Sequence, residues 1–182
     1  MRAPQAAVKP YARALHALAK ERGQTDAVGR DLETMAGAVA REAALRDFFS
    51  RPWIATAAKR SAAVEIAARL GLSPLVQDFV GLVARQGRAQ HLDAIAEAFR
   101  GMVDEDLGRA RARVRTAVSL TEPEREALRA RLGRVMGGKH VLVEEEVDQT
   151  LLGGFIAEIG SYIVDGSVDG QLARIGERLA RG

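Results

Sequence analysis

The chain has 182 residues, of which 47 % are apolar and 28 % charged, and it contains no cysteine. This length suits one large domain or two small ones, and the lack of cysteine excludes disulfides, cysteine nucleophiles and thiolate metal sites. The net charge is only +3, with both signs interspersed, so composition does not require a nucleic-acid partner. No apolar run approaches the ~18 residues of a membrane span, and residues 1–9 lack the apolar core of a signal peptide.

The N-terminal half shows apolar residues at helical spacing, punctuated by glycine and proline. Pro10 is expected in the first turn of a helix, where its missing N–H is harmless, and Ser73 is expected to cap another. The connections are short, which favours a compact antiparallel bundle. We expect six helices, over residues 10–23, 26–41, 42–49, 55–70, 73–87 and 89–103.

The fifth of these helices has more apolar surface than a single core contact requires. One interpretation is a helix that is buried all round. The other is a helix with one face open as a groove for a partner helix. The first helix has a similar surplus at Tyr11, Ala14 and Leu18. The fourth helix should turn Val64, Ala67, Ala68 and Leu70 inward.

The pattern changes from helix to strand at the boundary that we expect near residue 108. Ala112 and Val114 alternate with a row of arginines from Arg109 to Arg115, which predicts a strand with arginines on one side. Such a row could bind nucleic acid, but no aromatic residues are interleaved with it. Pairing with a neighbouring strand that carries Glu144, Glu145 and Glu146 is the favoured explanation.

The remaining segments predict a small α/β domain. Thr121 and Glu124 fit a capping box, and Leu128, Leu132 and Val135 would form the buried stripe of its helix. A strand through Val141 and Val143 follows. A β-hairpin over 155–164, turning at Gly160 and Ser161, precedes a helix that Ser167 caps and that carries Leu172, Ile175 and Leu179. The fold class is therefore mainly α, with an N-terminal six-helix bundle (1–107) and a small C-terminal α/β domain with a β-hairpin (108–182).

The residue types needed for catalysis do not gather anywhere in the sequence. His16, His91 and His140 lack metal-ligand spacing, and Asp148 and Asp165 are typical of turns and caps. No glycine-rich run has the form of a phosphate-binding loop. We expect no catalytic residues, no metal and no cofactor, and therefore a protein that is not an enzyme.

Three motifs carry a resemblance to a known family. The most specific is the run apolar-Asp-x-x-Leu-x-Gly-Gly-Phe that begins at Val147, continues as Ile163-Val-Asp-Gly-Ser-Val168 and leads into the last helix. The others are Lys9-Pro-Tyr-Ala-Arg-Ala-Leu15 and Leu82-Val-Ala-Arg-Gln-Gly-Arg88. Together they resemble the delta subunit of the F-type ATP synthase, whose mitochondrial counterpart is the oligomycin-sensitivity-conferring protein. The chain departs from the family pattern at Arg85 and Gln86, where acidic or polar residues and asparagine are usual.

The resemblance implies a stator subunit that joins the catalytic head to the peripheral stalk, so that rotor torque drives ATP synthesis. Its N-terminal domain would bind the N-terminal helix of an alpha subunit in a groove between its first and fifth helices, and its C-terminal domain would bind the stalk b subunits. It also implies one copy per complex, at the cytoplasmic face of the bacterial inner membrane, with no nucleic acid and no direct membrane insertion. The alternative is an RNA-binding regulator resembling an antitermination factor. By analogy the groove residues are Tyr11, Ala14, Leu18, Phe79, Leu82 and Val83.

Overall fold

The computed structural model describes residues 5–160 and 162–181, which are mainly helical and include one small four-stranded sheet. The chain divides into two compact units, Met1–Val103 and Asp104–Gly182, here called the N-terminal and C-terminal units. The division falls just before the boundary expected near residue 108. Ser161 and the first four residues lie outside the described residues, as does the side chain of Leu179.

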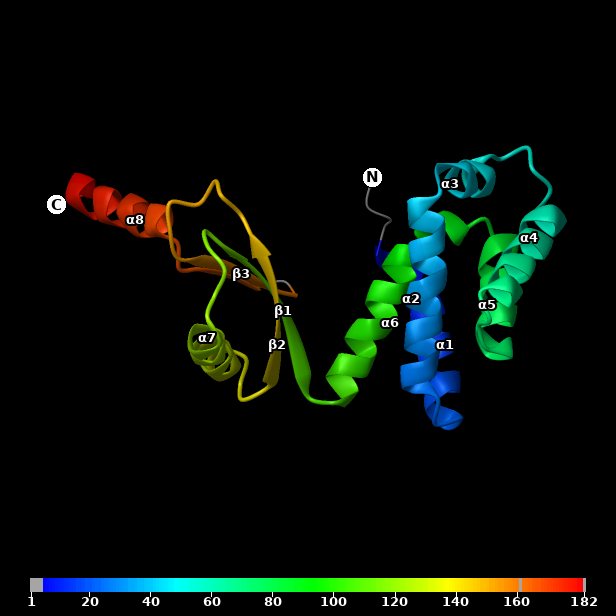
Figure 1. Cartoon of the computed structure of the whole chain (residues 1–182), viewed down its shortest axis with the longest axis horizontal. Helices are drawn as coiled ribbons and strands as arrows, with labels where there is room; N and C mark the ends of the chain where they lie inside the picture. The colour runs from blue at the N-terminus through cyan, green and yellow to red at the C-terminus, as the bar shows by residue number, and fades with distance from the viewer. Residues whose placement is uncertain (1–4, 161, 182) are drawn as a thin grey trace. The chain divides into compact units, whose positions relative to one another are not determined.

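The N-terminal unit is built from helices, in the order that the sequence predicts (Figure 1). The last helix of this unit continues for a few residues into the C-terminal unit. The elements are α1 (Gln5–Glu21), α2 (Thr25–Arg41), α3 (Ala43–Ser50), α4 (Thr56–Arg69), α5 (Pro74–Arg85), a 3-10 turn η1 (Ala89–His91) and α6 (Leu92–Asp106).

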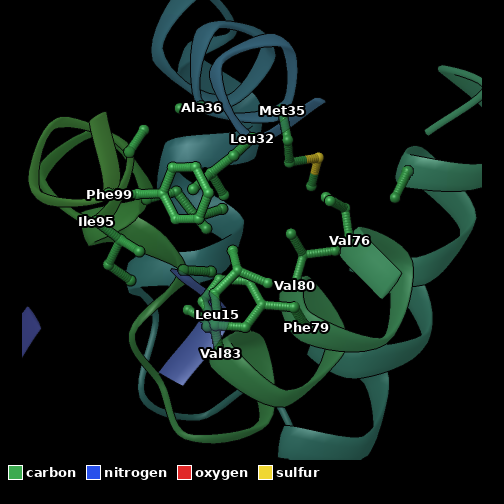
Figure 2. Packing of buried hydrophobic residues seen from close by; sticks show 14 of the residues in the cluster. Leu15, Leu32, Met35, Ala36, Val76, Phe79, Val80, Val83, Ile95 and Phe99 are labelled. Atoms are coloured by element: carbon green, nitrogen blue, oxygen red, sulfur yellow. The ribbon is translucent and has the colours of Figure 1, made fainter. Parts of the chain in front are cut away.

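One apolar core holds these helices together (Figure 2). Leu32 of α2 and Phe99 of α6 are at most 1 % exposed, and Leu15 of α1 and Val80 of α5 belong to the same cluster. Burial of each such side chain contributes ~1.5–3 kcal/mol before conformational entropy is counted. Residues from each of the helices α1 to α6 therefore meet in one cluster, and this packing positions the outer faces of α1 and α5.

The predictions for the start of α1 and for the inward face of α4 differ from the structure. Pro10 lies inside α1 and not in its first turn, because Val8 is only 2 % exposed and its burial in the core draws the preceding residues into the helix. In α4, Ala67 is buried as predicted and Val64 is half-buried, but Ala68 is exposed and Leu70, the residue after the helix, is 41 % exposed. Ala63, which the periodicity did not single out, is buried instead.

The face of α4 that turns inward depends on α5. A Cβ atom added to Gly81 would lie 2.8 Å from Cγ2 of Val64, so the missing side chain of Gly81 lets the two helices approach closely. Val64 is half-buried at this contact. The contact depends on a residue of another helix, which the periodicity of α4 alone does not reveal.

The C-terminal unit contains the sheet, one helix packed on it and one terminal helix (Figure 1). The strand order is β2-β1-β3-β4; β1 pairs parallel with β2 and antiparallel with β3, and β3 and β4 form the predicted hairpin. The elements are β1 (Arg109–Thr116), α7 (Glu122–Val135), β2 (His140–Val147), β3 (Phe155–Ile159), β4 (Tyr162–Asp165) and α8 (Val168–Arg181).

The core of this unit lies between the sheet and α7. Ala112 and Val114 of β1 face Leu132 of α7, and all three are fully buried. The arginines of β1 alternate with these residues, so the predicted two-sided strand is confirmed. Val135, expected in the buried stripe of α7, is instead 59 % exposed, because it is the last residue of the helix and extends past the sheet contact.

Candidate partner-binding surfaces

The first predicted binding residues lie on the flank of α1 beside its buried stripe. Tyr11 is half-buried and packs against the core, whereas Ala14 is exposed and Leu18 is 42 % exposed. Tyr11, Ala14 and Leu18 are three and four residues apart, so they share one side of the helix. Ala7, which the sequence analysis did not single out, lies on the same side of α1, four residues before Tyr11. Small side chains here leave room for a close helix contact.

The three predicted residues of α5 do not share one environment. Leu82 is 48 % exposed, whereas Phe79 is 8 % exposed and Val83 is fully buried. Figure 2 shows Phe79 and Val83 with Leu15 inside the core cluster to which all three belong. We call the six predicted residues of the two helices the α1/α5 face. Of the three α5 residues, Leu82 is therefore exposed to solvent, while Phe79 and Val83 belong to the core beneath it.

The outward stripe of α5 also contains residues that the sequence did not single out. Asp78 is exposed and Leu75 is half-buried, and they lie four and seven residues before Leu82, which places them on its side of the helix. Leu18 and Leu82 are among the few large apolar side chains of the described N-terminal unit that remain exposed, with Trp53 and Leu70.

The start of α5 is held by a residue from another helix. Ser73 occupies the N-cap position, but its side chain makes no capping hydrogen bond, contrary to the prediction. Instead its backbone N–H donates to the Asp31 carboxylate of α2 at 2.8 Å. An acidic group at a helix N-terminus also interacts favourably with the helix dipole. Asp31 thus fixes the start of α5 relative to α2.

A second exposed apolar surface lies on α8 of the C-terminal unit. Val168, Leu172 and Ile175 are spaced by four and three residues and are 40 %, 57 % and 54 % exposed. From Gln171 to Gly176 no described residue of α8 is buried, and Figure 1 shows the helix extending away from the sheet. An amphipathic helix with an uncovered apolar stripe is typical of a partner-binding element. Leu152, in the loop before β3, is 74 % exposed.

The motif that carried the family resemblance fixes where α8 begins. Val168 N–H donates to the Gly153 carbonyl oxygen at 3.0 Å, and Gly170 N–H donates to the Ser167 hydroxyl, as expected for the predicted cap. Gly154 has φ +78°, and a Cβ atom there would lie 2.4 Å from the carbonyl oxygen of Gly166. The close backbone approach explains this glycine, and the junction directs α8 away from the sheet.

Charged side chains are paired along and around β1. Arg111 contacts Glu144 at 2.7 Å and Asp104 at 3.0 Å, which confirms pairing between the arginine row and the glutamates of β2. Glu145 differs from its neighbours because successive strand residues point to opposite faces; it pairs with Arg125 of α7 at 2.8 Å.

Four carboxyl groups of this unit have a pKa below the ordinary value; in the capping box, hydrogen bonds from Thr121 lower the pKa of Glu124. The Arg125 guanidinium and then the Leu120 N–H lower the pKa of Glu145 by hydrogen bonding to its carboxylate. Hydrogen bonds from Thr150 lower the pKa of Asp148, and hydrogen bonds from Ser167 lower that of Asp165. These contacts hold the ends of β2 and β4, so the two aspartates serve structure.

The described residues include no group of three or more His, Cys, Asp or Glu side chains arranged to hold a metal ion. His16 lies edge-on to the Phe99 ring at 5.8 Å between centroids, and His91 contacts Gln90. No helix in the described part of the chain is long and apolar enough to cross a membrane.

Comparison with known proteins shows the family to which the chain belongs. The sequence profile of the family described as ATP synthase delta (OSCP) subunit matches residues 7–179. This chain belongs to that family. It is 33 % identical over 174 residues to the ATP synthase subunit delta of Syntrophobacter fumaroxidans, covering 96 % of this chain and 94 % of the relative. It is 37 % identical over 165 residues to that of Hyphomonas neptunium, covering 91 % of each.

Family membership favours a subunit of an F-type ATP synthase over the RNA-binding alternative. The fold is also similar to a chain in the solved structure of the Toxoplasma gondii mitochondrial ATP synthase hexamer, with a TM-score of 0.73 over 94 % of this chain and 96 % of that one. The two sequences are 20 % identical, so this likeness bears on the delta-family fold alone.

Proposed function

We propose that the chain is the non-catalytic stator subunit that joins the catalytic head of an F-type ATP synthase to its peripheral stalk, at the cytoplasmic face of the bacterial inner membrane. Membership of the delta family supports this proposal most directly. The two exposed apolar surfaces, on different units, fit a protein that connects two partners. A connector resists rotor torque through its binding surfaces, so it needs no reacting groups.

The N-terminal unit, as a six-helix bundle over residues 1–107, is the head-binding domain in this proposal. The α1/α5 face would receive the N-terminal amphipathic helix of one alpha subunit, whose apolar stripe would cover Leu18 and Leu82 and lie over Ala14. Phe79 and Val83 hold the α5 side of this surface in place from the core. One copy of the chain per complex is sufficient.

The C-terminal unit, over residues 108–182, is the stalk-binding domain in this proposal. Val168, Leu172 and Ile175 of α8 would pack against the helical ends of the b subunits, since helix-on-helix contact buries a stripe of this spacing.

The deciding experiment is calorimetric titration of the full chain with a peptide of the alpha-subunit N-terminus from the same organism. Binding with a negative heat-capacity change is expected, because apolar surface is buried. Leu82→Asp should weaken binding at least ~tenfold, which corresponds to ~1.4 kcal/mol. Leu70→Asp is the matched control, since Leu70, the residue after α4, is 41 % exposed and lies outside the face. If both variants bind like the wild type, the α1/α5 face is not the site.

The stalk side has a parallel test with purified b subunits. Ile175→Asp should weaken their binding at least ~tenfold, as expected when an apolar anchor is removed from an interface. Val118→Asp, at a position 72 % exposed in the same unit, should leave the affinity unchanged. Equal losses in the two variants would argue against α8 as the contact.

A further inference from the structure

A pocket of about 350 Å³ opens in the N-terminal unit, between the loop after α3, the first turn of α4 and the C-terminal end of α5. Phe49 and Ile54 line its apolar side, and Lys59 and Arg85 supply its charged groups. None of the described residues that line the pocket is acidic. The volume is at the lower end of ligand pockets, ~300–1,000 Å³, so the pocket suits a small molecule or ion.

Lys59 of α4 is a buried cation in this pocket. It is 6 % exposed, and its ammonium donates one hydrogen bond, at 2.9 Å, to the Phe49 carbonyl oxygen near the end of α3. Among the residues that the structure describes, no carboxylate pairs with this ammonium. Lysine is almost never buried to this degree unless it is paired with an opposite charge. An ammonium group has three donors, so two N–H bonds of Lys59 remain for a ligand.

Two further groups at the pocket favour a negative charge. Arg85, the exposed last residue of α5, has no ion-pair partner within the described part of the chain. Thr56, the first residue of α4, also lines the pocket, and no side chain caps this helix, whose N-cap residue is Ala55. The first backbone N–H groups of a helix have no partner inside the helix and lie at the positive end of its dipole. They therefore add to the attraction that the two cations exert on an anion.

The acidic residues nearest in sequence lie outside the lining of the pocket: Asp47, Glu65, Asp78 and Asp93. The Asp47 carboxylate is 3.7 Å from the Arg51 guanidinium. The Glu65 carboxylate is 2.6 Å from the guanidinium of Arg69. Asp78 is about two helical turns, ~10 Å, from the end of α5 that lines the pocket. The lining itself therefore carries a net positive charge, and this charge selects an anionic ligand.

We propose that this pocket binds a phosphate-type anion, either free phosphate or the phosphate group of a small ester. The phosphate oxygens accept N–H bonds from the Lys59 ammonium, the Arg85 guanidinium and the first turn of α4, and the carbon part of an ester lies against Ile54. Phosphate suits these donors because it carries more acceptor oxygens than a carboxylate, and lysine and arginine are common phosphate ligands. None of the lining residues belongs to the α1/α5 face, and the inference does not depend on the proposed function.

The test is calorimetric titration of the full chain with sodium phosphate and with phenyl phosphate, at an ionic strength held constant with sodium chloride. Saturable binding at one site is expected. Arg85→Gln should weaken it at least ~tenfold, as loss of a charged hydrogen-bond donor does. Arg41→Gln is the matched control, because Arg41 is likewise the exposed last residue of its helix but does not line the pocket. It should bind phosphate like the wild type.

The two ligands distinguish the two sources of the phosphate group. Tighter binding of phenyl phosphate supports a small phosphate ester as the ligand, and equal affinities support free phosphate. The absence of saturable binding for both ligands would overturn the site. Unchanged affinity in Arg85→Gln would also overturn it, and equal losses in Arg85→Gln and Arg41→Gln would show only a general attraction of anions to the surface. Lys59→Met should abolish binding, and since loss of its bond to Phe49 also destabilises the unit, Arg85→Gln is the deciding variant.

Discussion

The N-terminal and C-terminal units use their apolar side chains differently. In the N-terminal unit large residues such as Leu32, Ile95 and Phe99 are at most 1 % exposed and share one cluster. In the C-terminal unit the cluster is smaller, while residues such as Leu152, Ile163 and Leu172 are more than half exposed.

This difference shows how a connecting protein can divide its tasks. A unit with a large core keeps its shape without help and can present small, defined faces. A unit with a small core depends more on ion pairs, caps and close glycine contacts, and it retains apolar surface for a partner. We infer that the C-terminal unit is the less stable of the two until its partner binds.

The largest difference is expected from truncating a fully buried leucine in each unit. Leu132→Ala and Leu32→Ala should each cost ~2–5 kcal/mol, through lost burial and the cavity that remains. The C-terminal unit should unfold, whereas the N-terminal unit should stay folded with reduced stability. Hydrogen exchange measured by mass spectrometry, peptide by peptide, reports each unit separately. Retained protection in the C-terminal unit of Leu132→Ala would contradict the comparison.

Gly154→Ala should be the next most damaging change, at ~3 kcal/mol, because it combines positive φ with a backbone clash against Gly166. Gly160→Ala is the control that separates these causes. Gly160 has φ +60° and no atom within 4 Å of an added Cβ, so only the ~1 kcal/mol conformational cost is expected. Urea unfolding followed by circular dichroism gives both values, and equal losses would show that the clash is relieved.

Acid should destabilise the C-terminal unit through Glu145, Asp148 and Asp165, whose pKa values are lowered by hydrogen bonds. Groups with a depressed folded-state pKa contribute stability above their unfolded pKa and lose it as pH falls through the folded value. The protection of backbone amides in this unit against hydrogen exchange should therefore decline below about pH 4, the ordinary carboxyl range.

The contribution of Glu145 to this loss of stability in acid can be isolated by substitution. Glu145→Gln should flatten the decline with pH, because it removes the carboxylate that Arg125 and the Leu120 N–H hold. Glu146→Gln, on the opposite face of the same strand, should leave the profile unchanged. An identical pH profile for the wild type and Glu145→Gln would disprove this role.

The smallest expected loss of stability comes from removing a helix cap, and it should differ between the two predicted caps at Thr121 and Ser73. Thr121→Ala should cost ~1 kcal/mol, since the Thr121 side chain and Glu124 form a capping box at the start of α7. Ser73→Ala should cost much less, because the Ser73 hydroxyl makes no capping bond and Asp31 binds the backbone N–H instead. Thermal unfolding of the two variants measures the difference, and a larger loss for Ser73→Ala would reverse the assignment.

The sequence by itself determined the order of elements, the capping box at Thr121, the alternation of arginines along β1 and the hairpin of β3 and β4. These features have local causes: helix and strand periodicities of 3.6 and 2, and turn or cap chemistry within a few residues. The family also followed from the sequence alone, through the run of glycines, Asp165 and Ser167 whose hydrogen bonds and close contacts direct α8.

Tertiary structure decided which face of each apolar-rich helix points inward. The pattern of α5 did not distinguish Leu82, which is exposed, from Val83, which is buried, because its apolar residues extend around most of the helix. Only the contacts of α5 with Leu15 and the other core residues, together with the cap from Asp31, select the buried side. The Lys59 ammonium of α4 likewise donates a hydrogen bond to the Phe49 carbonyl oxygen of α3. Local periodicity carries no information about such contacts between helices.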